Sequence, residues 1–436
     1  MFDKMVLGKN QVFSCDSRET QINSNLIVVG PTGAGKTMSV TEPSLLYSEG
    51  SQVCTLTKRA LVRQYSEYFK RRDYHVLDVD FAHPDKSEYG YNPLNFVYSF
   101  EDIQALAYFI VMADPNKKDN KKADPFWDLS AEYLLEALIA YSMAVEKHPT
   151  MKHVMDLFNS LKIEESSGAI KTSLDDQFDT IRQMDSKHFA VIKFDYFCSN
   201  PYRTAACIYT TLAAALSSMF TPAICEMSRN RKQLDLRLLT EERGVLFLTT
   251  SAMNPVSNVI VALFYSQLFD ELLKIAEESP YERLPVSVRI TCDDIATGAP
   301  IPELAQKISI FRAAGISISM NVQSESQLEA MYSKEDATTI INNCDSYLYM
   351  GGTDIATAER IGKRLDLPIF DVLSLPLEKV CVFRRGQKPV ITKRYETLDD
   401  VRYKEMLEYT KIVRDRGDEE VNVKKRKQDN KEKEIA

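Results

Sequence analysis

The stretch that decides the fold reads Leu26-Ile27-Val28-Val29-Gly30-Pro31-Thr32-Gly33-Ala34-Gly35-Lys36-Thr37. Its apolar first four residues predict a short, buried parallel strand. The eight residues that follow fit the pattern G-x-x-x-x-G-K-[ST], and a helical pattern runs from Gly35 to Pro43. Between a strand and a helix, such a loop cradles phosphate with its backbone N–H groups. A chance glycine-rich turn is the alternative, and this context argues against it.

Each position of the loop has an expected task. The backbone that approaches the phosphates is expected to be that of Gly30, Pro31, Thr32, Gly33, Ala34 and Gly35. Lys36 is expected to reach the β- and γ-phosphates, and the Thr37 hydroxyl to bind Mg²⁺. The predicted cofactors are therefore ATP and Mg²⁺.

Outward from the loop, strands alternate with helices. We expect strands at 52–57, 75–80, 244–249, 286–291, 316–321 and 346–350, helices at 60–72 and 259–276, and a hairpin formed by 380–384 and 390–394. This alternation predicts an α/β fold with a mainly parallel central sheet.

The pattern changes near residue 100. From there to about residue 230 the apolar residues recur at helical spacing, as at Leu134, Leu135, Leu138 and Ile139, with hardly a strand-like run. We therefore expect an inserted all-helical domain. The predicted division is 1–100 and 236–400 for the two parts of the nucleotide-binding domain, 101–235 for the helical insert, and 401–436 for a helical extension with a charged, disordered tail.

A P-loop needs a carboxylate at the end of a neighbouring strand to hold Mg²⁺ or its water. Asp293 and Asp294 follow the apolar run 286–292. We expect Asp293 to be the acid on the metal side and Asp294 to orient or activate the attacking water. The alternative for this pair is a helix cap.

Two further polar residues complete the predicted catalytic set. Gln323 follows the strand 316–321 and is placed to sense the γ-phosphate or to position water. Arg312 lies just before that strand and is placed to reach the nucleotide of a neighbouring subunit. Taken alone, each would be read as an ordinary surface residue, and only the whole set of residues gives it a catalytic role.

Composition excludes several other classes. The net charge is −8, and 44% of the residues are apolar, as is usual for a globular protein. The eight cysteines show no paired spacing that would suggest zinc or a disulfide framework. No apolar run approaches the ~18 residues that a membrane-spanning helix needs. We therefore expect a cytoplasmic protein.

Many short motifs, spread over residues 24–395, resemble the coupling ATPases of type IV secretion and conjugation, the TraG/VirD class. The motifs that carry the resemblance are Tyr91-Asn92-Pro93-Leu94, Asp124-Pro125-Phe126-Trp127, Asp293-Asp294-Ile295-Ala296, Ile301-Pro302-Glu303-Leu304, the run 312–318 (Arg-Ala-Ala-Gly-Ile-Ser-Ile), Gln323-Ser324, Gln327-Leu328, the run 340–345 (Ile-Ile-Asn-Asn-Cys-Asp) and Gly351-Gly352-Thr353-Asp354. They occur in the order in which the family has them, which makes the resemblance specific.

The resemblance implies a RecA-like motor domain interrupted by an all-helical domain, assembled as a homo-hexameric ring that hydrolyses ATP between subunits. It implies single- or double-stranded DNA and relaxase-type protein cargo as substrates. It also implies a membrane-embedded secretion channel or anchor subunit as a partner at the inner face of the cell membrane. By position, Asp293 is then the Walker B acid, Arg312 the arginine that acts in trans, and Gln323 the sensor glutamine, beside the P-loop pair Lys36 and Thr37.

The chain departs from the family in three places. Asp294 stands where the family usually has Glu, and Leu56-Thr57-Lys58 stands where it often has Asp-Pro-Lys. The N-terminal membrane helices of many members are not seen. The first two departures leave open a nucleotide-binding recruitment hub with weak or no hydrolysis. A DNA translocase of the FtsK and HerA kind outside secretion also stays open, since that class shares the motor core.

Overall fold

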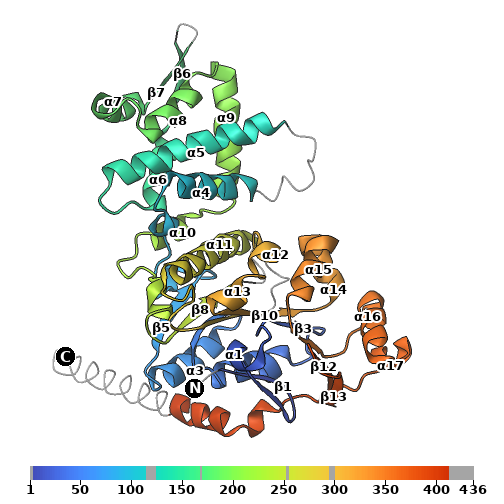
Figure 1. Cartoon of the computed structure of the whole chain (residues 1–436). Coiled ribbons are helices and arrows are strands. Elements are labelled where there is room, and N and C mark those ends of the chain that lie inside the picture. Colours follow the sequence, from blue (N-terminus) through green and yellow to red (C-terminus); the bar gives the residue numbers. More distant parts are fainter. Residues whose placement is uncertain (1–2, 114–123, 167–168, 252–254, 294–299, 412–436) are drawn as a thin grey trace, which may run out of the picture. The chain divides into compact units, whose positions relative to one another are not determined.

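The computed structural model describes residues 3–113, 124–166, 169–251, 255–293 and 300–411 (Figure 1). The chain divides into two compact units. One contains Met1–Asp78, Leu236–Thr249 and Leu272–Ala436, and the other contains Val79–Asp235 and Thr250–Glu271. The four-part division with boundaries at residues 100, 235 and 400 stays a prediction.

A nine-stranded sheet organises the first unit, in the order β13-β12-β11-β3-β10-β9-β4-β8-β5. Its strands are β3 (Leu26–Val29), β4 (Ser51–Leu56), β5 (His75–Asp80), β8 (Gly244–Thr249), β9 (Val288–Cys292), β10 (Ile316–Val322), β11 (Ser346–Tyr349), β12 (Lys379–Arg384) and β13 (Val390–Lys393). The pairs from β11 through β3, β10, β9 and β4 to β8 are parallel, and β12 and β13 are antiparallel additions. The predicted α/β fold with a mainly parallel central sheet is confirmed.

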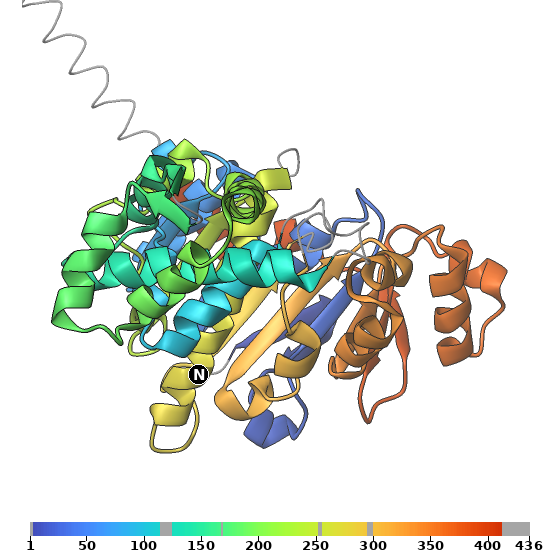
Figure 2. The ribbon, with the colours of Figure 1, turned by 90° about the horizontal axis from the view of Figure 1, so that it is seen from above.

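The middle of the sheet brings the glycine-rich loop and Asp293 to one edge. Strand β10 lies between β3 and β9 (Figure 2). Asn321 pairs with Val28 of β3, and Met320 pairs with Cys292 of β9. Because these strands are parallel, their carboxyl ends meet at the same edge of the sheet. The glycine-rich loop and Asp293 leave the sheet there.

The segment after the loop differs from the expected helix. Residues Thr37–Thr41 form η1, a π-helical turn in which the Glu42 N–H donates to the Thr37 carbonyl. Helix α2 (Glu42–Leu46) continues from it, with Pro43 in its first turn. The expectation that the helix ends at Pro43 is wrong, because a proline is tolerated where its missing N–H has no required partner.

Apolar side chains fix this segment against one face of the sheet. Val40 packs in a buried cluster with Leu26 and Val28 of β3 and Leu348 of β11. Met5 and Leu7 of an N-terminal hairpin, β1 (Lys4–Gly8) with β2 (Gln11–Ser14), join the same cluster. The position of η1 is therefore set by core packing.

Short helices complete the first unit. They are α1 (Ser17–Thr20), α3 (Arg59–Lys70), α12 (Leu304–Lys307), α13 (Phe311–Ala314), α14 (Glu325–Tyr332), α15 (Lys334–Asn342), α16 (Ile355–Leu365) and α17 (Ile369–Leu373). Residues 401–411 are also helical, and Tyr403 and Met406 pack on a buried cluster that includes Leu56 and Tyr65. The predicted charged tail falls on residues 412–436, outside the described residues.

The second unit is mainly helical, as expected (Figure 1). Its helices are α4 (Phe100–Met112), α5 (Pro125–Val145), α6 (Met151–Ser160), α7 (Asp175–Met184), α8 (Phe189–Cys198), α9 (Tyr202–Ser217) and α10 (Pro222–Met227), and α11 (Pro255–Glu278) belongs to it in part. Helix α5 is the centre, packed by α4, α8 and α9. A hairpin of β6 (Ile163–Ser166) and β7 (Ala169–Thr172) was not expected, since β6 reads Ile-Glu-Glu-Ser and offers little apolar alternation.

Among the described residues, none of the helices is both long enough and apolar enough to cross a membrane.

Candidate functional site

The loop between β3 and η1 has the backbone that a phosphate cradle requires. Gly33 and Gly35 have φ angles of 83° and 88°, in the left-handed region that favours glycine. The Ala34 N–H donates to the Pro31 carbonyl at 3.2 Å, which closes the loop into a tight turn. The Gly30 N–H donates to the Val322 carbonyl at 3.1 Å and ties the start of the loop to the end of β10.

Lys36 lies over the loop that it follows. Its Nζ donates to the Gly30 carbonyl at 2.6 Å and to the Pro31 carbonyl at 3.1 Å. The ammonium group therefore sits beside the loop backbone, where phosphate oxygens would be bound.

Thr37 and Asp293, predicted to share a metal ion, are in direct contact. The Thr37 hydroxyl donates to Asp293 Oδ2 with an Oγ1–Oδ2 distance of 2.8 Å. Hard oxygen ligands suit Mg²⁺, and two oxygens on adjacent corners of its octahedron lie roughly 3 Å apart. A site with one carboxylate, one hydroxyl and phosphate oxygens fits Mg²⁺ rather than a metal that needs several protein ligands. The two side chains fit the predicted ion, and their role stays a prediction.

The other oxygen of Asp293 is held by two residues that the sequence did not single out. Asn321 Nδ2 donates to Asp293 Oδ1 at 2.6 Å, and the Thr41 hydroxyl lies 3.4 Å from the same oxygen. Asn321 Nδ2 also donates to Thr41 Oγ1 at 3.0 Å. Asn321 and Thr41 are fully buried. The only sequence signal was that Asn321 lies near the end of the expected strand, two residues before Gln323.

A second buried acid lies near Asp293. Glu42 accepts a hydrogen bond from the Tyr65 hydroxyl at 2.8 Å. Burial raises the pKa of the Glu42 carboxyl, and the charge of Asp293 acts in the same direction, against the hydrogen bond from Tyr65. The environment therefore works against a second full negative charge beside Asp293.

Arg394 and Gln323 flank the loop. A Cβ atom built on Gly35 would lie 3.2 Å from Nη1 of Arg394, so this guanidinium borders the cradle. Gln323 directly follows β10, and its backbone N–H donates to Oε1 of Gln327 at 3.0 Å. Because Gly30 bonds to the neighbouring Val322, Gln323 lies at the entrance of the loop. Arg394 was not predicted from the sequence.

Arg312 is not brought to this site. It is exposed on α13, which precedes β10, whereas the P-loop lies beyond the other end of that strand. Seven residues at about 3.3 Å each separate the two edges by roughly 20 Å. Arg312 therefore cannot reach a phosphate bound in its own chain.

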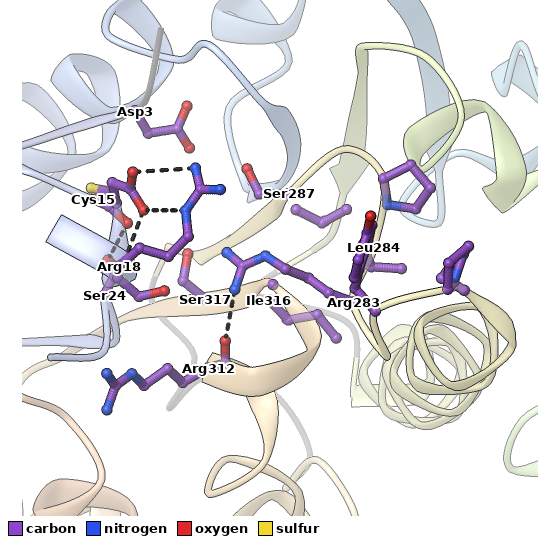
Figure 3. Close-up of a pocket in the computed structure, with 18 residues that line it drawn as sticks. Asp3, Cys15, Arg18, Ser24, Arg283, Leu284, Ser287, Arg312, Ile316 and Ser317 are labelled. Atoms are coloured by element: carbon purple, nitrogen blue, oxygen red, sulfur yellow. Dashed lines mark hydrogen bonds and ion pairs between the residues drawn. The ribbon is translucent and has the colours of Figure 1, made fainter. Parts of the chain in front are cut away.

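At its own edge of the sheet, Arg312 lines a cavity of about 490 Å³ together with Arg18 and Arg283 (Figure 3). Arg283 Nη1 donates to the Arg312 carbonyl at 3.4 Å, and Arg18 is paired with Asp16. Asp294, the fourth predicted catalytic residue, lies outside the described residues.

Comparison with known proteins identifies the family. The family model for "Type IV secretory system Conjugative DNA transfer" matches residues 2–366. No curated protein matches the chain.

Solved structures share the fold at low sequence identity. TrwB, a bacterial conjugative coupling protein, in complex with ADP and Mg²⁺ has 18% identity and a TM-score of 0.62, with 86% of each chain covered. The trigonal form of TrwBdeltaN70 in complex with sulphate has 18% identity, a TM-score of 0.63 and 85% of each chain covered. VirB4 of Thermoanaerobacter pseudethanolicus has 13% identity and a TM-score of 0.52, with 90% of this chain and 96% of that chain covered.

The resemblance seen in the sequence is thus confirmed by a match over most of the chain and by the shared fold. This chain belongs to the type IV secretory system conjugative DNA transfer family, with the RecA-like P-loop fold of its coupling proteins.

Proposed function

We propose that this chain binds ATP with Mg²⁺, hydrolyses the ATP, and uses the free energy to move DNA or nucleoprotein cargo to a type IV secretion channel. The contact between Thr37 and Asp293 carries the proposal. It joins the phosphate-binding loop to an acid that directly follows another strand, at 2.8 Å, in the arrangement that Mg²⁺-dependent phosphoryl transfer requires. The TrwB complexes with ADP and Mg²⁺ and with the ATP analogue ADPNP support it.

The side chains divide the work of hydrolysis. The backbone of residues 30–35 binds the phosphates, and Lys36 offsets charge that develops on the transferring phosphoryl group. Thr37 and Asp293 would hold Mg²⁺, which when bound neutralises charge on the β- and γ-oxygens. Gln323 and Asp294 orient the attacking water.

The position of Arg312 supports a ring. Its place at the far edge of the sheet suits a role at the nucleotide of the next subunit, as the resemblance implies. We therefore propose a homo-hexamer that works at the inner face of the membrane through a membrane-embedded channel or anchor subunit. Relaxase-type protein and its DNA are the proposed cargo.

Measuring ATP turnover with and without single-stranded DNA tests the motor function. The wild-type protein should hydrolyse ATP with Mg²⁺, and faster with DNA present. Lys36→Ala removes the cation at the phosphates and should lower turnover by at least ~100-fold. Equal turnover by the wild-type protein and Lys36→Ala in every condition would show that the proposed site does not hydrolyse ATP.

A recruitment hub with weak hydrolysis is the second candidate, favoured by Asp294 and by Leu56 in place of the usual acids. The carboxylate of Asp294 is one methylene shorter than that of Glu, and catalytic geometry is sensitive on the order of 1 Å. The motor function predicts measurable turnover in the wild-type protein. The hub function predicts tight ATP binding, negligible turnover, and a gain of turnover in Asp294→Glu.

A further inference from the structure

One side chain at the candidate site has neither a known role nor a place among the predicted catalytic residues. Asn321 is fully buried, on the face of β10 that meets η1. Its two amide hydrogens are both used, one on Asp293 Oδ1 and one on Thr41 Oγ1. Its own Oδ1 is buried and has no hydrogen-bond partner among the described residues.

The orientation of the amide follows from its contacts. If Oδ1 and Nδ2 exchanged places, an amide oxygen would lie 2.6 Å from a carboxylate oxygen, and the two would repel. Leaving Oδ1 without a partner costs free energy, since a buried acceptor loses its water. The observed orientation accepts this cost because it lets one N–H donate to Asp293 Oδ1 and the other to Thr41 Oγ1. The amide is therefore oriented by its hydrogen bond to the carboxylate.

The two oxygens of Asp293 have different surroundings as a result. Oδ1 faces the buried amide of Asn321 and the buried hydroxyl of Thr41. Oδ2 faces Thr37, the hydroxyl expected to bind Mg²⁺. A carboxylate held through one oxygen cannot rotate about its χ2 angle without breaking that hydrogen bond. Oδ2 is thereby kept toward the P-loop.

The π-helical turn contributes to the same arrangement. In η1 the backbone bonds from residue 42 back to residue 37, one residue wider than an α-helical turn. Thr37 and Thr41, four residues apart, then both face Asp293. Such turns occur often at functional sites.

We propose that Asn321 is a positioning residue that, with Thr41, holds Asp293 Oδ1 so that Oδ2 is presented to the Mg²⁺ of bound nucleotide. This inference rests on the proposed binding of ATP with Mg²⁺. It adds a residue outside the predicted catalytic set. Outer hydrogen-bond partners of metal ligands affect metal affinity by roughly 10–100-fold when they are removed.

The test separates metal binding from nucleotide binding. A fluorescent ATP analogue is titrated into the full-length protein, first in EDTA and then at increasing Mg²⁺. Asn321→Leu keeps the branching and the number of side-chain heavy atoms and removes the amide. It should bind the analogue in EDTA as the wild-type protein does, while the Mg²⁺ concentration for half-maximal enhancement rises about 10–100-fold.

Ser319 offers a matched control. It lies two residues earlier on the same face of β10, it is buried, and its hydroxyl has no partner in the part of the chain that the structure describes. Ser319→Ala should leave both titrations unchanged. If Asn321→Leu does not fold, Thr41→Val replaces it in the test. This substitution removes the second contact with Asp293 Oδ1, which is made by the Thr41 hydroxyl.

Two results would overturn the inference while leaving ATP binding intact. One is an unchanged Mg²⁺ dependence in Asn321→Leu. The other is an equal loss of binding with and without Mg²⁺, which would indicate a role in folding alone. If the wild-type protein binds no ATP analogue and matches Lys36→Ala, the proposed function itself is wrong, and the inference falls with it.

Discussion

Arg312→Ala is expected to lower ATP turnover by about 10³-fold or more, with ATP binding unchanged. An arginine that stabilises the transition-state charge in trans contributes roughly 10³–10⁵ to the rate. Arg312 lies at the opposite edge of the sheet from the P-loop of its own chain, so its loss leaves that loop intact. Turnover and analogue binding, measured on the same preparation, separate the two effects.

Mixing two inactive variants tests whether Arg312 acts between subunits. An equal mixture of Lys36→Ala and Arg312→Ala chains places an intact loop beside an intact arginine at roughly one quarter of the interfaces of a randomly assembled ring. The mixture should recover part of the activity that neither variant shows alone. Arg18→Ala is the control, since Arg18 lines the same cavity but is paired with Asp16. It should change turnover little, because exposed ion pairs contribute ~1 kcal/mol or less. No recovery in a mixture that assembles would exclude the trans role.

Asp293→Asn is expected to lower Mg²⁺-dependent turnover by on the order of 100-fold or more. A metal ion that polarises phosphoryl oxygens is worth several kcal/mol of transition-state stabilisation, and each 1.36 kcal/mol is about tenfold in rate. The amide keeps an oxygen that accepts the hydrogen bond from Asn321 Nδ2 but loses the charge that attracts Mg²⁺. Turnover measured across a range of Mg²⁺ concentrations should show both a lower maximum and a weaker metal dependence.

Glu42→Gln distinguishes the two neighbouring acids. Glu42 is also buried, but it contacts Tyr65 rather than Thr37. A glutamine still accepts the hydrogen bond from Tyr65, so turnover should stay within a few-fold of the wild-type value. A loss in Glu42→Gln as large as that in Asp293→Asn would mean that general electrostatics at the site, and not metal binding by Asp293, controls the rate.

The sequence predicted the site best where an apolar strand pattern is followed directly by residues with a recognisable chemical role. The strand before the loop and the strand before Asp293 were both predicted, β3 in full and β9 within two residues. Because the strands are parallel, the P-loop after β3 and Asp293 after β9 are expected at the same edge of the sheet. The observed hydrogen bond from Thr37 to Asp293 agrees with that expectation.

The partners of Asp293 were beyond the same reasoning. Asn321 reads as the last residue of a strand, and Thr41 as one more residue of a helix. The contacts of Asn321 and Thr41 with Asp293 depend on the π-helical turn and on the register of β10 against β9. Neither feature can be predicted from the residue types in these segments. The β6–β7 hairpin was missed because β6, which is largely exposed, carries almost no apolar residues that would mark a strand.

Strand β10 constrains how the length of this chain can change. Arg312 lies just before the strand, whereas Asn321 stands within its last two residues and Gln323 directly follows it. Side chains on a strand alternate between faces, so inserting one residue would turn Asn321 away from Thr41 and move Gln323 by about 3.3 Å. Deletion would do the same in the other direction. Loops elsewhere can lengthen without affecting the site, but related chains that keep this chemistry should keep the number of residues between Arg312 and Gln323.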